Sequence, residues 1–194
     1  MKNMSGFNLF ELLIVMSIVA IMAMIGIPSF KYVTAANRVS SEVNSLLGDM
    51  QYARSEAVKE GLPVTVCASA NPTATAPSCS GSNAWQTGWI VFSDPTNSQT
   101  LAAGVLPLRV QPAFTAQDTF TASNNVQAVT FNREGFANAG QVGAVSVIAG
   151  VTIKLHDSTA APQWTRCLAI NSASANTVGM LATERVAAAT PNCT

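Results

Sequence analysis

The chain has 194 residues, of which almost half are apolar and only a tenth are charged, and its ten basic residues balance its ten acidic ones. This length accommodates one folded domain and an appendage. The balanced charge excludes an overall electrostatic field that would recruit nucleic acid or an anionic membrane surface.

The N-terminal stretch is apolar from Phe7 to Ile27, with only Asn8, Glu11 and Ser17 as polar interruptions. A helix of this length, at about 1.5 Å per residue, spans about 30 Å, which is the thickness of a bilayer core. We therefore expect a transmembrane helix in residues 7–30.

Three positions distinguish this stretch from a plain membrane anchor. Glu11 places a carboxylate in an apolar segment, which is unfavourable unless the group finds a partner, so Glu11 is a candidate functional residue. Pro28 lacks an amide hydrogen and is expected to kink or locally open the helix. Gly6 precedes the apolar run, whereas the cleavage site of a secretory signal follows it, so cleavage at Gly6 would leave the helix on the mature chain.

Helical periodicity continues beyond Pro28 and predicts an amphipathic helix in residues 31–61. The apolar residues that recur at three- and four-residue steps are Val39, Val43, Leu46, Leu47, Met50, Ala53 and Ala57. Charged residues, among them Glu42 and Asp49, are expected mainly on the other faces. Gly61, followed by Pro63, predicts the end of a helix that runs from Leu9 to Glu60.

Strand signals dominate residues 62–194. The candidate strands are Val64–Ser69, Gly88–Ser93, Val105–Gln111, Val126–Asn132, Ala144–His156, Thr165–Asn171 and Val178–Val186. One long helix packed on an antiparallel sheet gives an α+β fold.

The four cysteines allow three disulfide connectivities, and their spacing matches no C-x-x-C pattern. An N-terminal membrane signal favours an oxidising compartment, in which cysteines pair. We favour the two local pairs, Cys67–Cys79 and Cys167–Cys193, because each closes a polar, turn-rich segment. Reduced, buried thiols are the alternative.

The sequence predicts neither catalysis nor a cofactor. His156 is the only histidine and has no nucleophile that a motif supports. The carboxylates Glu134, Asp157 and Glu184 are scattered, and no metal-ligand or phosphate-loop spacing occurs.

The run from Gly6 to Ile14 resembles the prepilin signature of type IV pilins and type II secretion pseudopilins. Gly6 matches the glycine before the cleavage point, Phe7 the aromatic first mature residue, and Glu11 the glutamate at the fifth mature position. Pro28 follows the apolar run as in the family, whereas Asn8 replaces the usual threonine.

This resemblance implies how the N-terminus is processed and used. A membrane prepilin peptidase would remove the leader, residues 1–6, and methylate the new N-terminus at Phe7. Glu11 would pair with the N-terminal amine of a neighbouring subunit as it leaves the bilayer. The subunit would first reside in the bacterial inner membrane, with residues 62–194 as a periplasmic domain, and then join a filament of other pilins.

Five further blocks extend the resemblance to the minor pilins called FimU and FimT in pili and GspH in type II secretion. They are Gln51–Ala57, Val64–Cys67, Gly88–Phe92, Phe131–Gly135 and Arg166–Ile170. We interpret these blocks as pieces of the core and turns: Trp89 and Phe92 fill the sheet–helix interface, and Arg133–Gly135 forms a hairpin turn.

The resemblance implies a minor pilin of a priming or tip complex, which supports pilus assembly and hence twitching motility or adhesion. A minor pseudopilin of type II secretion is one alternative. The other is a DNA-binding pilin for natural transformation, for which Lys154, Arg166 and Arg185 are the candidate phosphate contacts. The Gly-Arg-x-Arg motif of such pilins is absent, since Arg185 follows Glu184, so DNA binding is not favoured.

Overall fold

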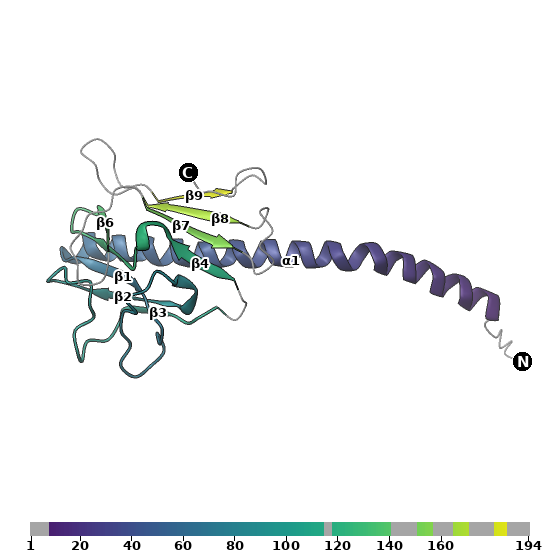
Figure 1. The fold of residues 1–194 in the computed structure, drawn as a ribbon, viewed down its shortest axis with the longest axis horizontal. Coiled ribbons are helices and arrows are strands. Elements are labelled where there is room, and N and C mark those ends of the chain that lie inside the picture. Colours follow the sequence, from purple (N-terminus) through teal and green to yellow (C-terminus); the bar gives the residue numbers. More distant parts are fainter. Residues whose placement is uncertain (1–7, 115–117, 141–150, 157–164, 171–180, 186–194) are drawn as a thin grey trace, which may run out of the picture. The chain divides into compact units, whose positions relative to one another are not determined.

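The computed structural model describes residues 8–114, 118–140, 151–156, 165–170 and 181–185. The chain divides into two compact units, residues 1–38 and residues 39–194. One helix, α1 (Leu9–Glu60), contributes to both units, and the strands belong to the second (Figure 1).

Helix α1 has the bounds that its periodicity predicts. It ends where Gly61 adopts a φ of 68° and donates its amide hydrogen to the carbonyl of Ala57 at 3.0 Å. This is a left-handed glycine cap, so the predicted stop is confirmed. Helix α1 continues across Pro28, and the expected kink or local opening there stays a prediction.

The described strands form two antiparallel sheets rather than one. Sheet A has the order β3-β2-β1-β5-β6 and sheet B the order β4-β7-β8-β9. Sheet A comprises β1 (Val64–Ala68), β2 (Trp89–Ser93), β3 (Arg109–Gln111), β5 (Ala128–Phe131) and β6 (Ala137–Gly140). Sheet B comprises β4 (Thr119–Ala122), β7 (Val151–His156), β8 (Arg166–Ile170) and β9 (Leu181–Arg185). Short 3-10 helices, η1 (Trp85–Thr87) and η2 (Ser123–Asn125), precede β2 and β5.

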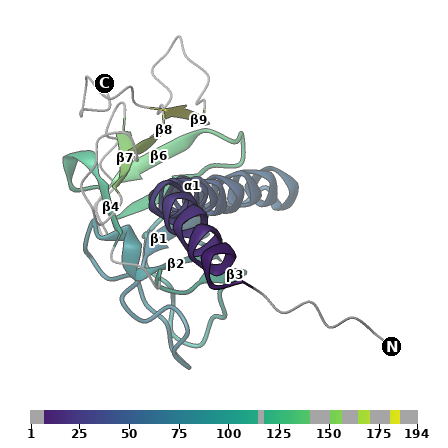
Figure 2. The ribbon, with the colours of Figure 1, turned by 90° about the vertical axis from the view of Figure 1, so that its right-hand side faces the viewer.

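One apolar core joins the second half of α1 to both sheets. Figure 2 shows β1 and β2 of sheet A below β8 and β9 of sheet B. The predicted apolar face of α1 is buried from Val39 to Ala57, with Leu47 partly covered. Side chains of β1 and β7, such as Val66 and Ile153, pack in the same core. The amphipathic half of the helix is thus stabilised by the burial of a single face.

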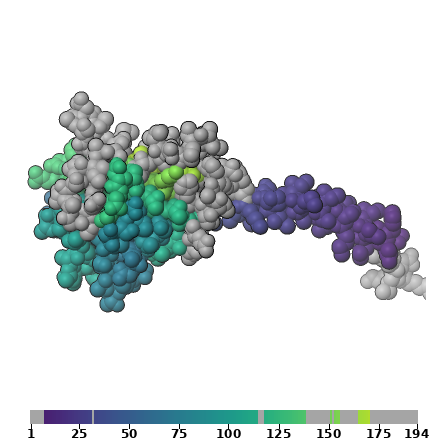
Figure 3. Space-filling model, viewed as in Figure 1, coloured from purple at the N-terminus to yellow at the C-terminus, as the bar shows by residue number. Residues whose placement is uncertain are grey.

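Sheet A is also covered on the face opposite α1. Because side chains alternate along a strand, Cys67 and Phe92 lie on this second face, where they pack with Ile90, Cys79 and Leu101. The expectation that Phe92 fills the sheet–helix interface is therefore wrong, whereas Trp89 does lie in that interface. Two loops, residues 69–84 and residues 94–108, supply the cover, and they project at the lower side of Figure 1 and Figure 3.

Buried polar contacts fasten the second loop to this face. The carboxylate of Asp94 is 2% exposed and accepts hydrogen bonds from the Thr65 hydroxyl at 3.0 Å and from the Gln99 amide at 2.7 Å. The amide of Ser98 donates to the same carboxylate at 2.9 Å. A carboxylate with several donors is tolerated in the interior, so Asp94 holds the loop in place.

The first loop is fastened by the disulfide Cys67–Cys79, which has a Cα–Cα distance of 5.6 Å. The predicted local pairing of these two cysteines is confirmed. Cys167 in β8 is also disulfide-bonded, and its predicted partner, Cys193, lies outside the described residues.

Replacing Cys67 and Cys79 together by serine is expected to reduce the free energy of unfolding by about 3 kcal/mol, because the crosslink restricts the unfolded chain. The measurement is urea unfolding of the detergent-solubilised chain, followed by tryptophan fluorescence. Wild-type protein under oxidising conditions is the reference, because reduction would also break the disulfide of Cys167. A change below about 0.5 kcal/mol, which is typical of a neutral surface substitution, would contradict this prediction.

Strand prediction succeeded for β1, β2, β5 and β8, and β7 and β9 lie within the predicted strands Ala144–His156 and Val178–Val186. The predicted strand Val105–Gln111 shrinks to Arg109–Gln111, and β4 and β6 were not predicted. The described part of Ala144–His156 begins at Val151. Residues 144–150 and 178–180 of the predicted strands lie outside the described residues.

Candidate assembly surface

The first unit presents an apolar surface on all sides of α1. Its large apolar side chains from Leu9 to Val33 are exposed by 46–80%. Glu11 is the only charged residue between Leu9 and Phe30. Among the described elements, α1 alone is long and apolar enough to cross a membrane. Such a surface is unfavourable in water, so lipid or other apolar helices must cover it.

Asn8 and Glu11 define how this helix begins. The carbonyl oxygen of Asn8 accepts a hydrogen bond from the amide of Leu12 at 3.2 Å, and its side-chain oxygen accepts one from the amide of Phe10 at 3.3 Å. Asn8 is therefore the N-cap. Glu11 is then the third helical residue, the position of the acidic partner in a capping box, where the helix dipole favours a negative charge.

Two hydroxyl side chains of this unit, those of Ser17 and Thr34, form hydrogen bonds with carbonyls of their own helix. The Ser17 hydroxyl donates to the carbonyl of Ile14 at 2.7 Å, and the Thr34 hydroxyl donates to that of Phe30 at 2.8 Å. Such bonds let a hydroxyl sit in an apolar helix. Within the described residues, the Glu11 carboxylate accepts no hydrogen bond, so it differs from these hydroxyls.

Several predicted site residues lie outside the described residues. Gly6 and Phe7, the expected cleavage and methylation positions, are among them. Cleavage and methylation therefore stay predictions.

The three cations predicted as phosphate contacts lie on neighbouring strands but do not share one face. Arg166 in β8 pairs in register with Leu155 and with Arg185, whereas Lys154 pairs with Cys167. Because in-register partners share a face and adjacent residues alternate, Lys154 and Arg166 lie on opposite faces of sheet B. Arg166 donates to the Ser40 hydroxyl of α1 at 2.8 Å, which places it on the helix side.

A second contact between α1 and a sheet was not expected from sequence. The carboxylate of Asp49 accepts hydrogen bonds from the Trp89 indole at 2.8 Å and from the Arg109 guanidinium at 3.0 Å. The same guanidinium stacks 4.0 Å from the ring centroid of Tyr52. Asp49 is 9% exposed. The sequence places Asp49 off the apolar face without indicating this burial, which a buried indole donor and an arginine compensate.

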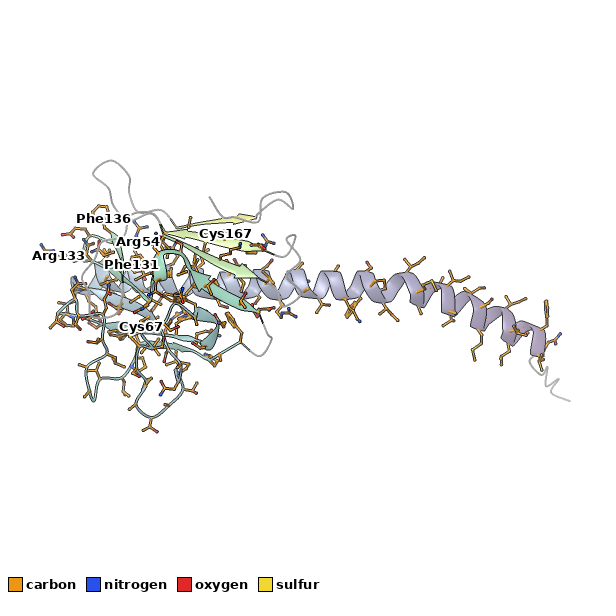
Figure 4. The ribbon with its side chains drawn as sticks, in the orientation of Figure 1. Arg54, Cys67, Phe131, Arg133, Phe136 and Cys167 are labelled. Atoms are coloured by element: carbon orange, nitrogen blue, oxygen red, sulfur yellow. A yellow bond between two sulfur atoms is a disulfide. The ribbon has the colours of Figure 1, made fainter. Side chains whose placement is uncertain are left out.

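The predicted turn at Arg133–Gly135 is confirmed. The side-chain oxygen of Asn132 accepts hydrogen bonds from the amides of Glu134 at 3.1 Å and Phe136 at 2.8 Å. This turn joins β5 to β6 near Arg54 of α1 (Figure 4). The block is a structural turn in the described structure.

The geometry gives no support for a metal centre. Within the described ranges, no group of three or more His, Cys, Asp or Glu side chains could hold a metal ion.

A single long N-terminal helix packed on antiparallel sheets is the pilin fold. The chain belongs to the GspH family, since the family model described as type II transport protein GspH matches residues 42–174. The family consists of structural pilins and pseudopilins, and membership implies assembly with other pilins in a filament.

Two solved structures of the type IV minor pilin FimU from Pseudomonas aeruginosa resemble the chain. The first has a TM-score of 0.53 and 22% identity, and the match covers 76% of this chain and 89% of FimU. The second has a TM-score of 0.47 and 21% identity and covers 78% and 90%. At this identity the first structure supports the fold alone. No curated protein matches the chain.

Proposed function

We propose that the chain is a minor pilin, a structural subunit of a priming or tip complex that supports pilus assembly and hence twitching motility or adhesion. The observation that carries this proposal is the exposed apolar first half of α1, with a single carboxylate in its first turn. Membership of the GspH family supports it.

In this proposal the apolar helix changes its surroundings once. The prepilin peptidase removes residues 1–6 and methylates Phe7 while the helix lies in the inner membrane and the globular unit lies in the periplasm. The carboxylate of Glu11 then pairs with the terminal amine of a neighbouring subunit, because an unpaired charge among apolar helices is unfavourable. Apolar helices of other pilins replace lipid around the rest of the segment.

The test is the variant Glu11→Gln, which removes the charge but retains the capping position, because glutamine also serves as the third helical residue of a capping box. We expect its incorporation into filaments to fall by about tenfold or more, since the charge pairs in an apolar environment. The measurement is the amount of the subunit in sheared filaments relative to the processed subunit in membranes.

Ser17→Ala is the matched control, because Ser17 bonds only to its own helix among the described residues, and its incorporation should match wild type. Wild-type incorporation of Glu11→Gln would refute the assembly role. Equal losses in Glu11→Gln and Ser17→Ala would show that any polar change in the helix is harmful, and would also refute it.

A minor pseudopilin of type II secretion is the second candidate, and the family description favours it. Deletion of the gene separates the two, because loss of surface pili supports the first candidate and loss of protein secretion supports the second.

DNA uptake is not favoured, since Lys154 and Arg166 lie on opposite faces of sheet B and affinity for DNA accumulates from several cations presented together.

A further inference from the structure

The globular unit exposes a cluster of large apolar side chains beside the edge strand β3. We call this cluster the β3 patch. Its members are Val105, Leu106, Leu108 and Val110, with exposures of 44%, 78%, 40% and 40%. Single exposed apolar residues are ordinary on protein surfaces, but a contiguous group indicates an interaction site.

A pocket of about 300 Å³ lies next to the β3 patch, between the two loops that cover sheet A. One wall is formed by residues 75–78 and the other by residues 101–106, so Val105 and Leu106 belong to both pocket and patch. The adjoining disulfide at Cys79 and the packing of Leu101 fasten the two walls. Both loops lie in the part that projects at the lower side of Figure 3. A fastened apolar pocket suits insertion of one apolar side chain from a partner.

The patch and pocket carry no charge of their own. The only charged side chain in the segment 101–112, Arg109, faces the opposite side of β3, where it binds Asp49 and Tyr52 of α1. Prolines at positions 107 and 112 bracket the strand. Because proline has no amide hydrogen to donate, strand-to-strand pairing at this edge is restricted. The partner must therefore contact side chains, and its surface must be apolar.

The size of the surface decides which partner fits. A stable interface between two soluble proteins needs about 800 Å² and 20–30 residues on each side. Four apolar side chains and one pocket supply only a fraction of this, so the surface does not hold a partner by itself. The β3 patch and its pocket can hold a partner that a second contact already keeps close, because binding at the patch is then effectively intramolecular. The apolar half of α1 supplies such a second contact when pilins assemble.

We propose that the β3 patch and its pocket form a lateral contact with a neighbouring pilin of the filament, which inserts an apolar side chain between the two loops. This proposal rests on the proposed filament function. It assigns to the loops 69–84 and 94–108 the task of recognising a neighbouring subunit, whereas α1 supplies the common packing.

The test places a photo-reactive phenylalanine derivative at Leu106, in the full chain in cells that assemble filaments. The matched control carries it at Leu62, which is also exposed, at 41%, but lies outside the patch. We expect a crosslink from position 106 to another pilin, identified by mass spectrometry, and none from position 62. The crosslink should disappear when Glu11→Gln is combined with the probe, because the contact depends on assembly.

A second measurement compares Leu106→Ser with Leu62→Ser. We expect incorporation of Leu106→Ser to fall about fivefold, since serine loses much of the apolar area that leucine buries, whereas Leu62→Ser stays at the wild-type level. Equal incorporation of the two variants overturns the proposal, as does a crosslink to a protein that is not a pilin.

The failure of this proposal is distinguishable from the failure of the proposed function. If filaments contain the chain but position 106 gives no crosslink, only the lateral contact is refuted. If Glu11→Gln assembles normally, the assembly role of Glu11 is refuted, whatever position 106 shows.

Discussion

Gly88→Ala is expected to unfold the globular unit under conditions in which the wild-type chain is stable. Gly88 joins η1 to β2 with a φ of 102°. A Cβ atom there would lie 2.4 Å from the carbonyl oxygen of Gln111 and 2.8 Å from the side chain of Pro72. The nearest atom belongs to the backbone of β3, so it cannot move without disrupting sheet A.

We expect a loss of about 4 kcal/mol or more in the free energy of unfolding, from the left-handed backbone and the overpacking together. This is a large part of the 5–15 kcal/mol, roughly, that stabilises a typical domain. Urea unfolding followed by fluorescence of the buried Trp85 and Trp89 measures it.

Gly48→Ala is the matched control. Gly48 lies within α1, and an added Cβ would meet nothing within 4 Å. Because alanine is the better helix former, this variant should gain about 0.8 kcal/mol. A Gly88→Ala loss below about 1 kcal/mol would show that the loop relaxes around the new atom, contrary to the clash argument.

Among the single substitutions, Asp49→Ala is expected to have the second largest effect, a loss of about 3 kcal/mol in the free energy of unfolding. Trp89 is fully buried and donates its indole hydrogen to Asp49 at 2.8 Å. Removal of the carboxylate leaves this donor buried without an acceptor, which is more unfavourable than the loss of an exposed bond.

The variant Arg109→Ala removes the ion pair with Asp49 but leaves the hydrogen bond from the Trp89 indole. The Arg109 side chain is 49% exposed, so solvent screens its charge. We expect this variant to reduce the free energy of unfolding by less than about 1 kcal/mol. Asp49→Asn should fall between these two variants, since its amide oxygen still accepts from Trp89. Equal effects of Asp49→Ala and Arg109→Ala would show that the ion pair, and not the indole bond, holds the helix against sheet A.

The elements that sequence predicts well are those with a strong local period. Helix α1 was predicted because its first half is a continuous apolar run and because apolar residues from Val39 to Ala57 recur at helical steps. Gly61 marks its C-terminal end. The strands β1 and β2 were predicted because each is a run of branched and aromatic residues. By contrast, β6 reads Ala-Asn-Ala-Gly, and pairing with β5 rather than local preference makes it a strand.

Contacts between distant parts of the chain account for most of the errors. The burial of Asp49 was not predicted, because a helical period cannot reveal an indole donor forty residues later in sequence. The exposed leucines of the β3 patch were predicted as strand because local apolar character does not distinguish a core from an interface. For the candidate assembly surface, the apolar stretch and Glu11 were found from sequence alone, whereas the arrangement of Lys154 and Arg166 required the register of sheet B.

The disulfide of Cys67 also reports where the chain folds. Cys67 is fully buried beneath the first loop, so its bond to Cys79 closes when the second layer over sheet A is built. Thiols stay reduced in the cytosol and oxidise outside it. In the proposed function the globular unit lies in the periplasm, so this pair would oxidise only after export, and the first loop would be fastened over sheet A there.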